Sequence, residues 1–195
     1  MADTPHSLLA RIQADDAPAD WGRLVGLYTP LLARWLRGRL PQDADVDDIV
    51  QDVMAVVVVK LAGFRHPGQV GSFRSWLRAI LANRLKTFWR DRFRGPVAAG
   101  GDRFDQVVAA LETTDGDLVR QWDEEHDRHI ISQLLDQIRC EFAAATWVAF
   151  QRYVIDGQPP EAVAAELGVS VNAVFITRSR VIRRLREEAA GLVDD

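Results

Sequence analysis

The sequence predicts an all-α protein of two small helical domains joined by a flexible linker, and three observations carry this prediction. Apolar residues recur at helical spacing along most of the chain, without a convincing strand pattern. Residues 95–117 open with GPVAAGGD and continue as polar, acidic sequence, which is typical of a linker. The last quarter of the chain has the spacing of a helix–turn–helix. We therefore expect domains at 1–94 and 118–195.

Two helices are predicted in the first forty residues. The first is capped by Thr4 and runs through Gln13, with its leucines and isoleucine on one face. The second runs from about Ala19 to Leu40. Pro30 lies inside it and should kink or split it, because proline removes a backbone hydrogen bond and clashes with the preceding turn.

A third helix is expected from about Asp45 to Leu61, with aspartates in a first turn that favours negative charge. The run AVVVVKL within it is β-branched, but the apolar residues keep a period near 3.6 and favour a helix. Asp47, Asp48 and Asp52 also resemble a magnesium-binding motif of prenyl-transfer enzymes. Those enzymes need a large helical cavity and a second acidic cluster, and this short sequence offers neither. A helix with a polar face for a protein partner is the preferred interpretation.

The segment from Gly71 to Arg94 is the most unusual in the chain, and it follows a predicted loop at 63–71. It holds seven Arg or Lys and one Asp, whereas the whole chain has a net charge of −4. On a helical wheel its apolar residues form one face, with Trp76 and Trp89 at the edges. A surface of this kind suits single-stranded or opening nucleic acid, because its cations bind phosphates and its aromatic rings stack on unpaired bases. The alternative is an amphipathic helix whose tryptophans belong to the core.

The stretch PPEAVAAELGVSVNAVFITRSRVIRRL predicts a helix–turn–helix. Gly168 lies where the turn needs a positive φ, and Ser170 is placed to cap the second helix. Ala164 is the small residue at the close approach of the two helices. The second helix should enter the major groove of DNA, with arginines following onto phosphates. The apolar residues expected between the helices are Val163, Leu167, Val169 and Val174.

Composition excludes several classes of protein. No run of 18 apolar residues could span a membrane, and the N-terminus lacks the pattern of a signal peptide. The single cysteine, Cys140, excludes a disulfide framework and a cysteine-based zinc site. We expect a cytoplasmic protein that has no cofactor, no metal and no catalytic activity of its own.

Taken together, these stretches resemble the extracytoplasmic-function (ECF) group of bacterial sigma factors, the two-domain initiation subunits of RNA polymerase. DVDDIVQDVMAVVVVKL looks like region 2.2, which in that family binds the clamp helices of the polymerase β′ subunit. GSFRSWLRAILANRLKTFWRDR is similar to regions 2.3 and 2.4, which melt and read the −10 element. The C-terminal motif resembles region 4, which reads the −35 element. WDEEHDRH and SRVIRRLREE resemble ECF groups abundant in planctomycete-like bacteria.

The resemblance implies three sets of functional residues. The polymerase-binding set is Asp45, Asp48, Ile49, Gln51, Asp52, Val53, Val56 and Lys60. The set for the −10 element is Phe64, Phe73, Arg74, Trp76, Arg78, Asn83, Lys86 and Arg90, with Arg84 expected to pair with an aspartate instead. The set for the −35 element is Ser170, Asn172, Phe175, Arg178, Ser179, Arg180, Arg183 and Arg184.

The implied partners are core RNA polymerase, through the β′ clamp helices and the β flap, and promoter DNA; the resemblance also leaves room for an anti-sigma factor. Phe175, Ile176 and Thr177 depart from the family pattern, which puts the −35 sequence in question.

Two rival interpretations remain: a stand-alone helix–turn–helix regulator, and a sigma mimic that only sequesters an anti-sigma partner. Between residues 95 and 137 acidic residues outnumber basic ones ten to three. This excess suggests a closed free form in which carboxylates mask basic surface.

Overall fold

The computed structural model is helical throughout the residues it describes, which are 7–15, 17–40, 42–65, 72–92, 101–113 and 115–193. Within these ranges nine α-helices are found and no strand, so the predicted all-α class is confirmed. The expected cap Thr4, most of the predicted loop at 63–71 and the stretch GPVAAGGD up to Gly100 lie outside the described residues. No helix in the described ranges is long and apolar enough to cross a membrane.

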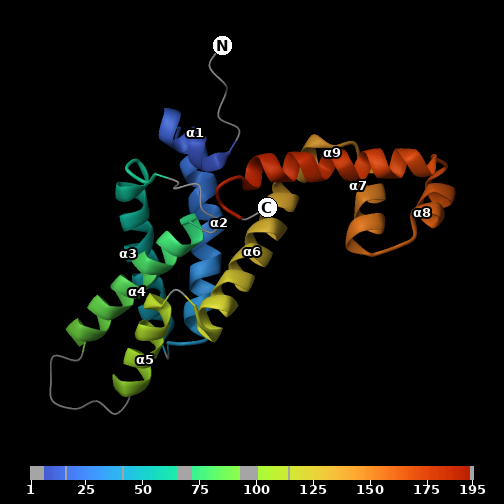
Figure 1. Cartoon of the computed structure of the whole chain (residues 1–195). Coiled ribbons are helices and arrows are strands. Elements are labelled where there is room, and N and C mark those ends of the chain that lie inside the picture. Colours follow the sequence, from blue (N-terminus) through green and yellow to red (C-terminus); the bar gives the residue numbers. More distant parts are fainter. Residues whose placement is uncertain are drawn as a thin grey trace.

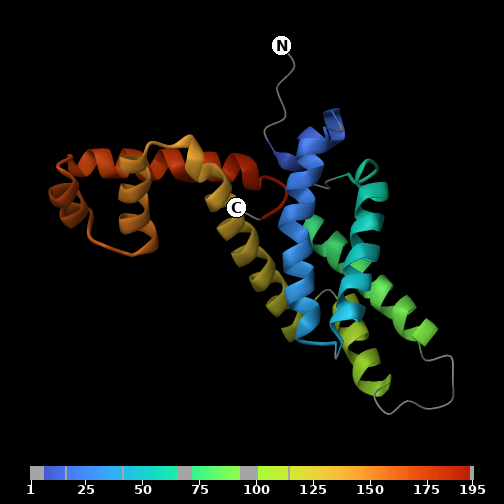
Figure 2. The same ribbon diagram turned by 180° about the vertical axis from the view of Figure 1, so that it is seen from behind.

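The N-terminal half is built around α2. Helix α1 spans Leu8–Asp15, α2 spans Pro18–Arg37 and α3 spans Asp43–Leu61. In both views of the ribbon α2 lies between α3 and α6 (Figures 1 and 2). Pro18 begins α2, where its missing N–H costs nothing. Pro30 does not split α2, because burial of leucines on both sides of it outweighs a cost of about 3 kcal/mol.

Helix α4 spans Ser72–Arg92 and crosses α3, as predicted for the basic segment. Its buried face carries Phe73, Leu77, Leu81 and Leu85, each at most 1% exposed. Helix α5, Gly101–Glu112, packs against α4 and buries Val108 and Leu111. The structure therefore has a packed helix inside the segment that the sequence predicted to be a flexible linker. The apolar spacing of Val108 and Leu111, three residues apart, is the signal for it.

Helix α6, Asp117–Ile138, joins the two halves of the molecule. Its Trp122, Ile130 and Leu134 are fully buried in the same core as α1 to α4. Trp122 meets Trp35 of α2 edge to face, with ring centroids 5.5 Å apart. Packing thus continues past residue 117, where the sequence placed a boundary. The division into domains remains a prediction.

The C-terminal half extends to one side of α6 (Figure 1). A short 3-10 turn at Arg139–Glu141 leads into α7, Ala144–Phe150, which continues as one π-helical turn at Gln151–Ile155. Helix α8 spans Pro160–Leu167 and α9 spans Val171–Ala189. Two small apolar clusters hold this part: Ile138, Trp147, Phe150 and Val181 form one, and Ala149, Val163, Ala164 and Val174 form the other.

Candidate nucleic-acid and polymerase interfaces

One face of α3 is exposed and carries acidic, amide and apolar side chains. Asp48, Gln51 and Asp52 lie on this face, as the sequence predicted, and Lys60 is exposed at its end. Val59, which no prediction singled out, is 79% exposed, and Val58 is 45% exposed. The two adjacent exposed valines form an apolar patch beside polar residues, and such a patch is typical of a contact site.

Other residues predicted to bind polymerase lie inside the protein. Ile49 and Val53 are core residues, at most 1% exposed, and Asp45 is buried as well. Val56 is half-buried. Positions 45, 49 and 53 are four residues apart and share the inward face of α3, so direct contact with a partner is excluded for them in this structure. The sequence also indicates that part of the valine run 56–59 faces outward. At a period of 3.6, four adjacent residues cannot all face the core.

An aromatic cluster lies where the loop after α3 meets the start of α4. The ring of Phe64 is 4.9 Å from that of Trp76 and 5.5 Å from that of Phe73. Phe64 and Trp76 are half-buried and each keeps an accessible part, whereas Phe73 is 1% exposed and packs on Tyr28 of α2. Phe73 therefore supports the cluster from below. Of these three rings, those of Phe64 and Trp76 are accessible enough to stack on a base.

Two arginines predicted to hold phosphates are instead paired with α6. Arg74 Nη1 is 2.7 Å from Asp127 Oδ2, and Arg74 Nε is 2.8 Å from Asp123 Oδ1. Arg78 Nη1 lies 3.9 Å from Asp123 Oδ1 of α6, and Arg78 Nη2 donates at 3.1 Å to the backbone oxygen of Thr113, just before that helix. Both arginines are at most 9% exposed as residues. In this conformation neither one can reach a nucleic acid.

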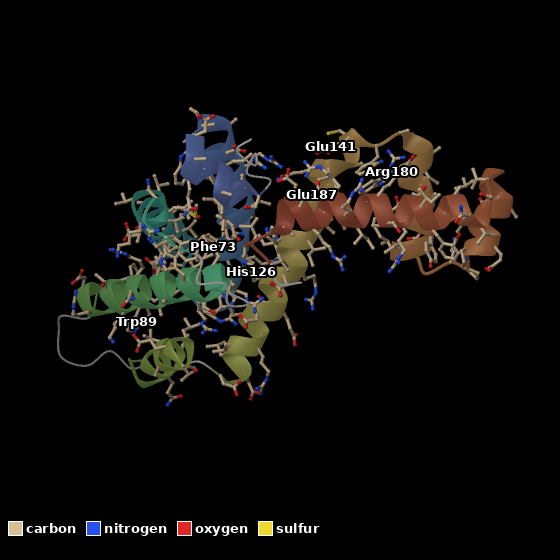
Figure 3. The ribbon with its side chains drawn as sticks, turned by 45° about the horizontal axis from the view of Figure 1, so that its top comes forward. Phe73, Trp89, His126, Glu141, Arg180 and Glu187 are labelled. Carbon is tan, nitrogen blue, oxygen red and sulfur yellow. The ribbon has the colours of Figure 1, made fainter. Side chains whose placement is uncertain are left out.

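His126 connects the ion pair between Arg74 and Asp127 to the core. His126 Nδ1 lies 2.9 Å from Asp127 Oδ1, and His126 Nε2 lies 3.3 Å from Tyr28 Oη. The geometry fits a neutral imidazole that donates to the carboxylate and accepts from the phenol. Figure 3 shows Phe73 and His126 where α4 and α6 approach each other.

Burial and hydrogen bonds set the charge states of the side chains in this network. It lowers the pKa of His126, although Asp127 opposes the shift, and it raises the pKa of Tyr28 well above its ordinary value. Burial tends to raise the pKa of Asp127 too, but hydrogen bonds from His126 and Arg74 outweigh it and lower that pKa. Burial raises the pKa of Asp123 and prevails over the two arginines beside it. Neutral His126 and ionised Asp127 are thus mutually consistent.

The outer face of α4 keeps the polar side chains that the sequence predicted there. Asn83 and Arg90 are exposed, and Asn83 donates to the backbone oxygen of Ala79. Lys86 is 63% exposed and lies 3.3 Å from Glu112 of α5, a surface pair that another anion can easily replace. Arg84 is half-buried, and no ion pair with an aspartate is found for it among the described residues. Its predicted structural pairing was therefore wrong.

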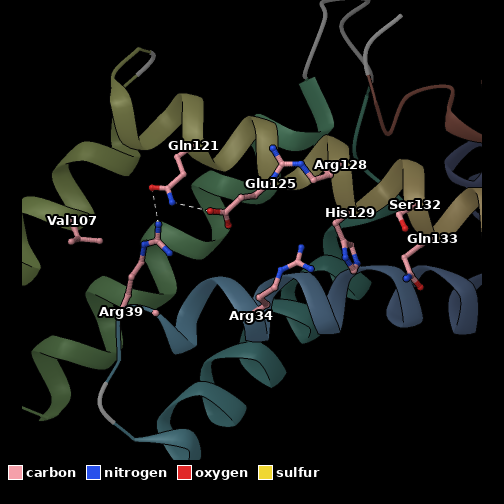
Figure 4. A pocket seen from close by; sticks show the side chains of 10 residues that line it. Arg34, Arg39, Val107, Gln121, Glu125, Arg128, His129, Ser132 and Gln133 are labelled. Atoms are coloured by element: carbon pink, nitrogen blue, oxygen red, sulfur yellow. Dashed lines mark hydrogen bonds between the residues drawn. The ribbon is translucent and has the colours of Figure 1, made fainter. Parts of the chain in front are cut away.

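A cavity of about 930 Å³ lies between the end of α2 and α6 (Figure 4). Arg39 stacks on Trp35, with its guanidinium 3.8 Å from the ring centroid, and donates to Gln121. Gln121 in turn donates to Glu125 at 2.8 Å. His129 donates from Nε2 to the backbone oxygen of Leu27 at 2.9 Å. The bonds of Arg39 with Gln121 and of His129 with Leu27 join α6 to α2 and to the residues just after it, and sequence reasoning predicted neither.

The helix–turn–helix has the predicted local geometry. Gly168 has φ of 67° and accepts the left-handed conformation that ends α8. Ser170 caps α9, its hydroxyl accepting from the backbone N–H of Ala173 at 3.1 Å. Val163, Ala164 and Val174 are buried between the helices, and Leu167 is half-buried. Val169 is 45% exposed, so its predicted burial was wrong; it lies in the turn itself, between the two helices.

Most of the residues predicted to contact the −35 element are exposed on α9 or at its N-cap. They are Ser170, Asn172, Phe175, Arg178, Ser179, Arg180 and Arg183. Arg184 is the exception: its guanidinium lies 2.6 Å from Glu141 and 2.6 Å from Glu188. Hydrogen bonds that Arg184 donates to Glu141 and Glu188 raise its pKa. Arg184 therefore anchors the end of α9 and is not available to DNA in this conformation.

Sequence reasoning missed the contribution of α6. The spacing of Trp122, His126 and Ile130, four residues apart, gives one buried stripe, and Asp123 and Asp127 lie beside it at the same spacing. That pattern was visible in WDEEHDRHII, but its partner helices were not. Glu188 was missed as well. It is 2% exposed and also pairs with Arg11 and Arg23.

The comparisons agree with the N-terminal half of this description. Residues 24–95, from α2 through the end of α4, match the family described as Sigma-70 region 2. No curated protein matches the chain closely enough to count as a relative. Within the described residues no group of three or more His, Cys, Asp or Glu side chains is placed to hold a metal ion. Residues 24–95 are thus similar to Sigma-70 region 2, and this similarity supports a sigma factor role in RNA polymerase binding and promoter melting.

Proposed function

We propose that this protein is an alternative sigma factor of the ECF group that directs core RNA polymerase to promoters with a −10 and a −35 element. The observation that carries the proposal is the match of residues 24–95 to Sigma-70 region 2, together with a capped helix–turn–helix at α8 and α9. The matched segment precedes the helix–turn–helix along the chain, which is the order that the resemblance to ECF sigma factors implies.

The exposed face of α3 is the proposed polymerase-binding surface. Asp48 and Asp52 supply charge there, and Val59 supplies apolar area close by. A mixed face of this kind gives both steering and burial to an interface. The contact to the β′ clamp helices belongs to this surface, and the contact to the β flap to the C-terminal half.

The −10 contact is proposed at α4 and the aromatic cluster. Stacking on Phe64 and Trp76 supplies about 1–3 kcal/mol per unpaired base, which offsets the cost of opening the duplex. Asn83, Lys86 and Arg90 are already exposed for contacts to the strand. Arg74 and Arg78 join them only if phosphates replace Asp123, Asp127 and the carbonyl of Thr113 as their partners.

The test is co-elution of the full chain with core RNA polymerase on size exclusion. Asp48→Arg and Val59→Arg should abolish co-elution, because each puts a new charge on the proposed surface. Asp136→Arg, on an exposed site of α6, is the matched control and should co-elute as the wild type does. Val53→Arg is unsuitable, since Val53 is 0% exposed and the change would unfold α3.

Two outcomes overturn the proposal. If the wild-type chain stays apart from polymerase and yet shifts duplex DNA alone, it is a stand-alone regulator. If the chain co-elutes but the polymerase initiates no transcription from any promoter in a fragment library, promoter recognition fails and a sigma mimic takes its place.

A further inference from the structure

The first half of α9 carries two large apolar side chains on its outer face. Phe175 is 43% exposed and Ile176 is 51% exposed, whereas Val174 and Val181 are buried. Asn172 and Ser179 lie three to four residues away on the same face, and both are exposed. This is the face that a helix–turn–helix presents to a DNA groove.

The ring of Phe175 has a defined contact with the rest of the protein. The ring of Phe175 meets the ring of Tyr153 edge to face, with centroids 5.7 Å apart. The hydrogen bond from the backbone of Ala173 to Ser170 fixes the first turn of α9 two residues earlier. The contact with Tyr153 therefore restricts the ring of Phe175 while leaving it 43% exposed.

The surroundings of this apolar pair indicate what it meets. Arg178, Arg180 and Arg183 are exposed along the next turns of α9. Figure 3 shows Arg180 on α9, well away from the contact of α4 with α6. A partner that fits must offer anionic groups beside apolar ones. The major groove of DNA does so, because it has phosphates along its rims and the C5-methyl group of thymine on its floor.

We propose that Phe175 and Ile176 read thymine methyl groups in the upstream promoter element. The inference rests on the proposed function, since it assumes that α9 enters the groove there. Neither side chain has a hydrogen-bonding group, so neither can specify guanine or adenine by a bidentate contact. Their selectivity comes from methyl contact alone, and it favours thymine over cytosine at two or more neighbouring base pairs.

The test begins with the holoenzyme, assembled from the full chain and core polymerase, and a promoter library randomised at the upstream element. Selected elements should contain thymines, on either strand, in a cluster. Each thymine is then replaced by uracil, which removes only the methyl group. The loss of about 0.8 kcal/mol expected for one buried methyl corresponds to roughly fourfold weaker binding for each critical position.

Protein variants complete the experiment. Ile176→Ala should weaken binding to thymine-containing DNA and remove the sensitivity to uracil at the position that Ile176 contacts. Phe175→Ala should do the same at another position, and Ile176→Ala keeps the test decisive if loss of the Tyr153 contact impairs folding. Ile155→Ala is the matched control: Ile155 is 55% exposed but lies outside α9, so uracil sensitivity should persist.

The possible results separate the inference from the function on which it rests. A holoenzyme that selects an upstream element and binds its uracil form as tightly as its thymine form overturns the inference alone. The inference also fails if uracil costs the same in the wild type and in both variants, or if Ile176→Ala weakens polymerase binding instead of DNA binding. A chain that neither joins polymerase nor selects an element overturns the proposed function itself.

Discussion

Arg74 and Asp127 are 53 residues apart in the sequence and form an ion pair of 2.7 Å that joins α4 to α6. Arg74 also lies 2.8 Å from Asp123, so one guanidinium meets two carboxylates that are each 30% exposed. The pair connects the basic helix α4 to α6, the helix that leads into the C-terminal half. Any nucleic acid that uses Arg74 must therefore compete with α6.

The first prediction concerns stability. Asp127→Asn removes the charge that faces Arg74 and weakens the acceptor for His126, so the free energy of unfolding should fall by about 1–3 kcal/mol. Urea unfolding followed by tryptophan fluorescence measures this. Asp136→Asn, on an exposed site of the same helix, should change stability by less than about 0.5 kcal/mol. Equal effects of the two changes would mean that the ion pair contributes nothing.

The second prediction concerns access to α4. When Asp123 and Asp127 are both changed to Asn, Arg74 and Arg78 lose their carboxylate partners and can meet phosphates instead. Binding of the free chain to a single-stranded −10 oligonucleotide should then become several-fold tighter and more sensitive to salt, with a log–log slope steeper by about 1. Fluorescence anisotropy across a salt series measures both. An unchanged affinity would show that α6 does not restrict the basic surface.

The third prediction is a loss of stability in mild acid. Burial lowers the pKa of His126 and of His129 below the ordinary value of 6.5. The unfolded chain therefore takes up protons on these residues before the folded chain does. Their stabilising contribution is present above pH 6.5 and is lost as the pH falls below it, by at most about 1.4 kcal/mol per pH unit for each histidine.

Unfolding in urea at pH 7.5 and at pH 5.5 tests this, with His126→Gln for comparison. The variant should be less stable at pH 7.5 but should lose less stability on acidification. The comparison goes no lower than pH 5.5, because the raised pKa of Asp123 makes acidification stabilising and so acts in the opposite direction at lower pH. If wild type and variant respond to pH alike, His126 is not the group responsible.

How far the sequence predicted the structure depends on the range of the interaction. Gly168 and Ser170 act on their own neighbours, and both have the role expected for them. Helix α4 was predicted because its period of 3.6 lies within one segment. Arg74, Arg78 and Arg184 were assigned to DNA by the family resemblance, but each is paired with a residue distant in sequence. Pairing of that kind depends on tertiary packing, which no local pattern encodes.

The fourth prediction compares two glycines. At Gly168, with φ of 67°, a Cβ meets no atom within 4 Å, so Gly168→Ala costs only backbone strain, about 1–2 kcal/mol. Gly26 lies inside α2 and is just as open, but there alanine suits the helix, so Gly26→Ala should stabilise the protein by about 0.5–1 kcal/mol. Thermal unfolding of the two variants should shift in opposite directions, and a shift in the same direction would contradict the left-handed turn.

The fifth prediction concerns Glu188, which is 2% exposed and lies within 3.5 Å of Arg11, Arg23 and Arg184. Arginines of α1, α2 and α9 share this carboxylate, so Glu188→Gln removes it and leaves them Asp20 and Glu141 as carboxylate partners. The free energy of unfolding should fall by about 2–4 kcal/mol. This lies toward the lower part of the range for removing one partner of a buried ion pair, because the arginines are partly solvated. Its neighbour Glu187 is 42% exposed and 4.0 Å from Arg184, so Glu187→Gln should cost under about 0.5 kcal/mol. Urea unfolding of both variants decides whether the end of α9 is anchored to the N-terminal helices, since a detached α9 would make the two substitutions equivalent.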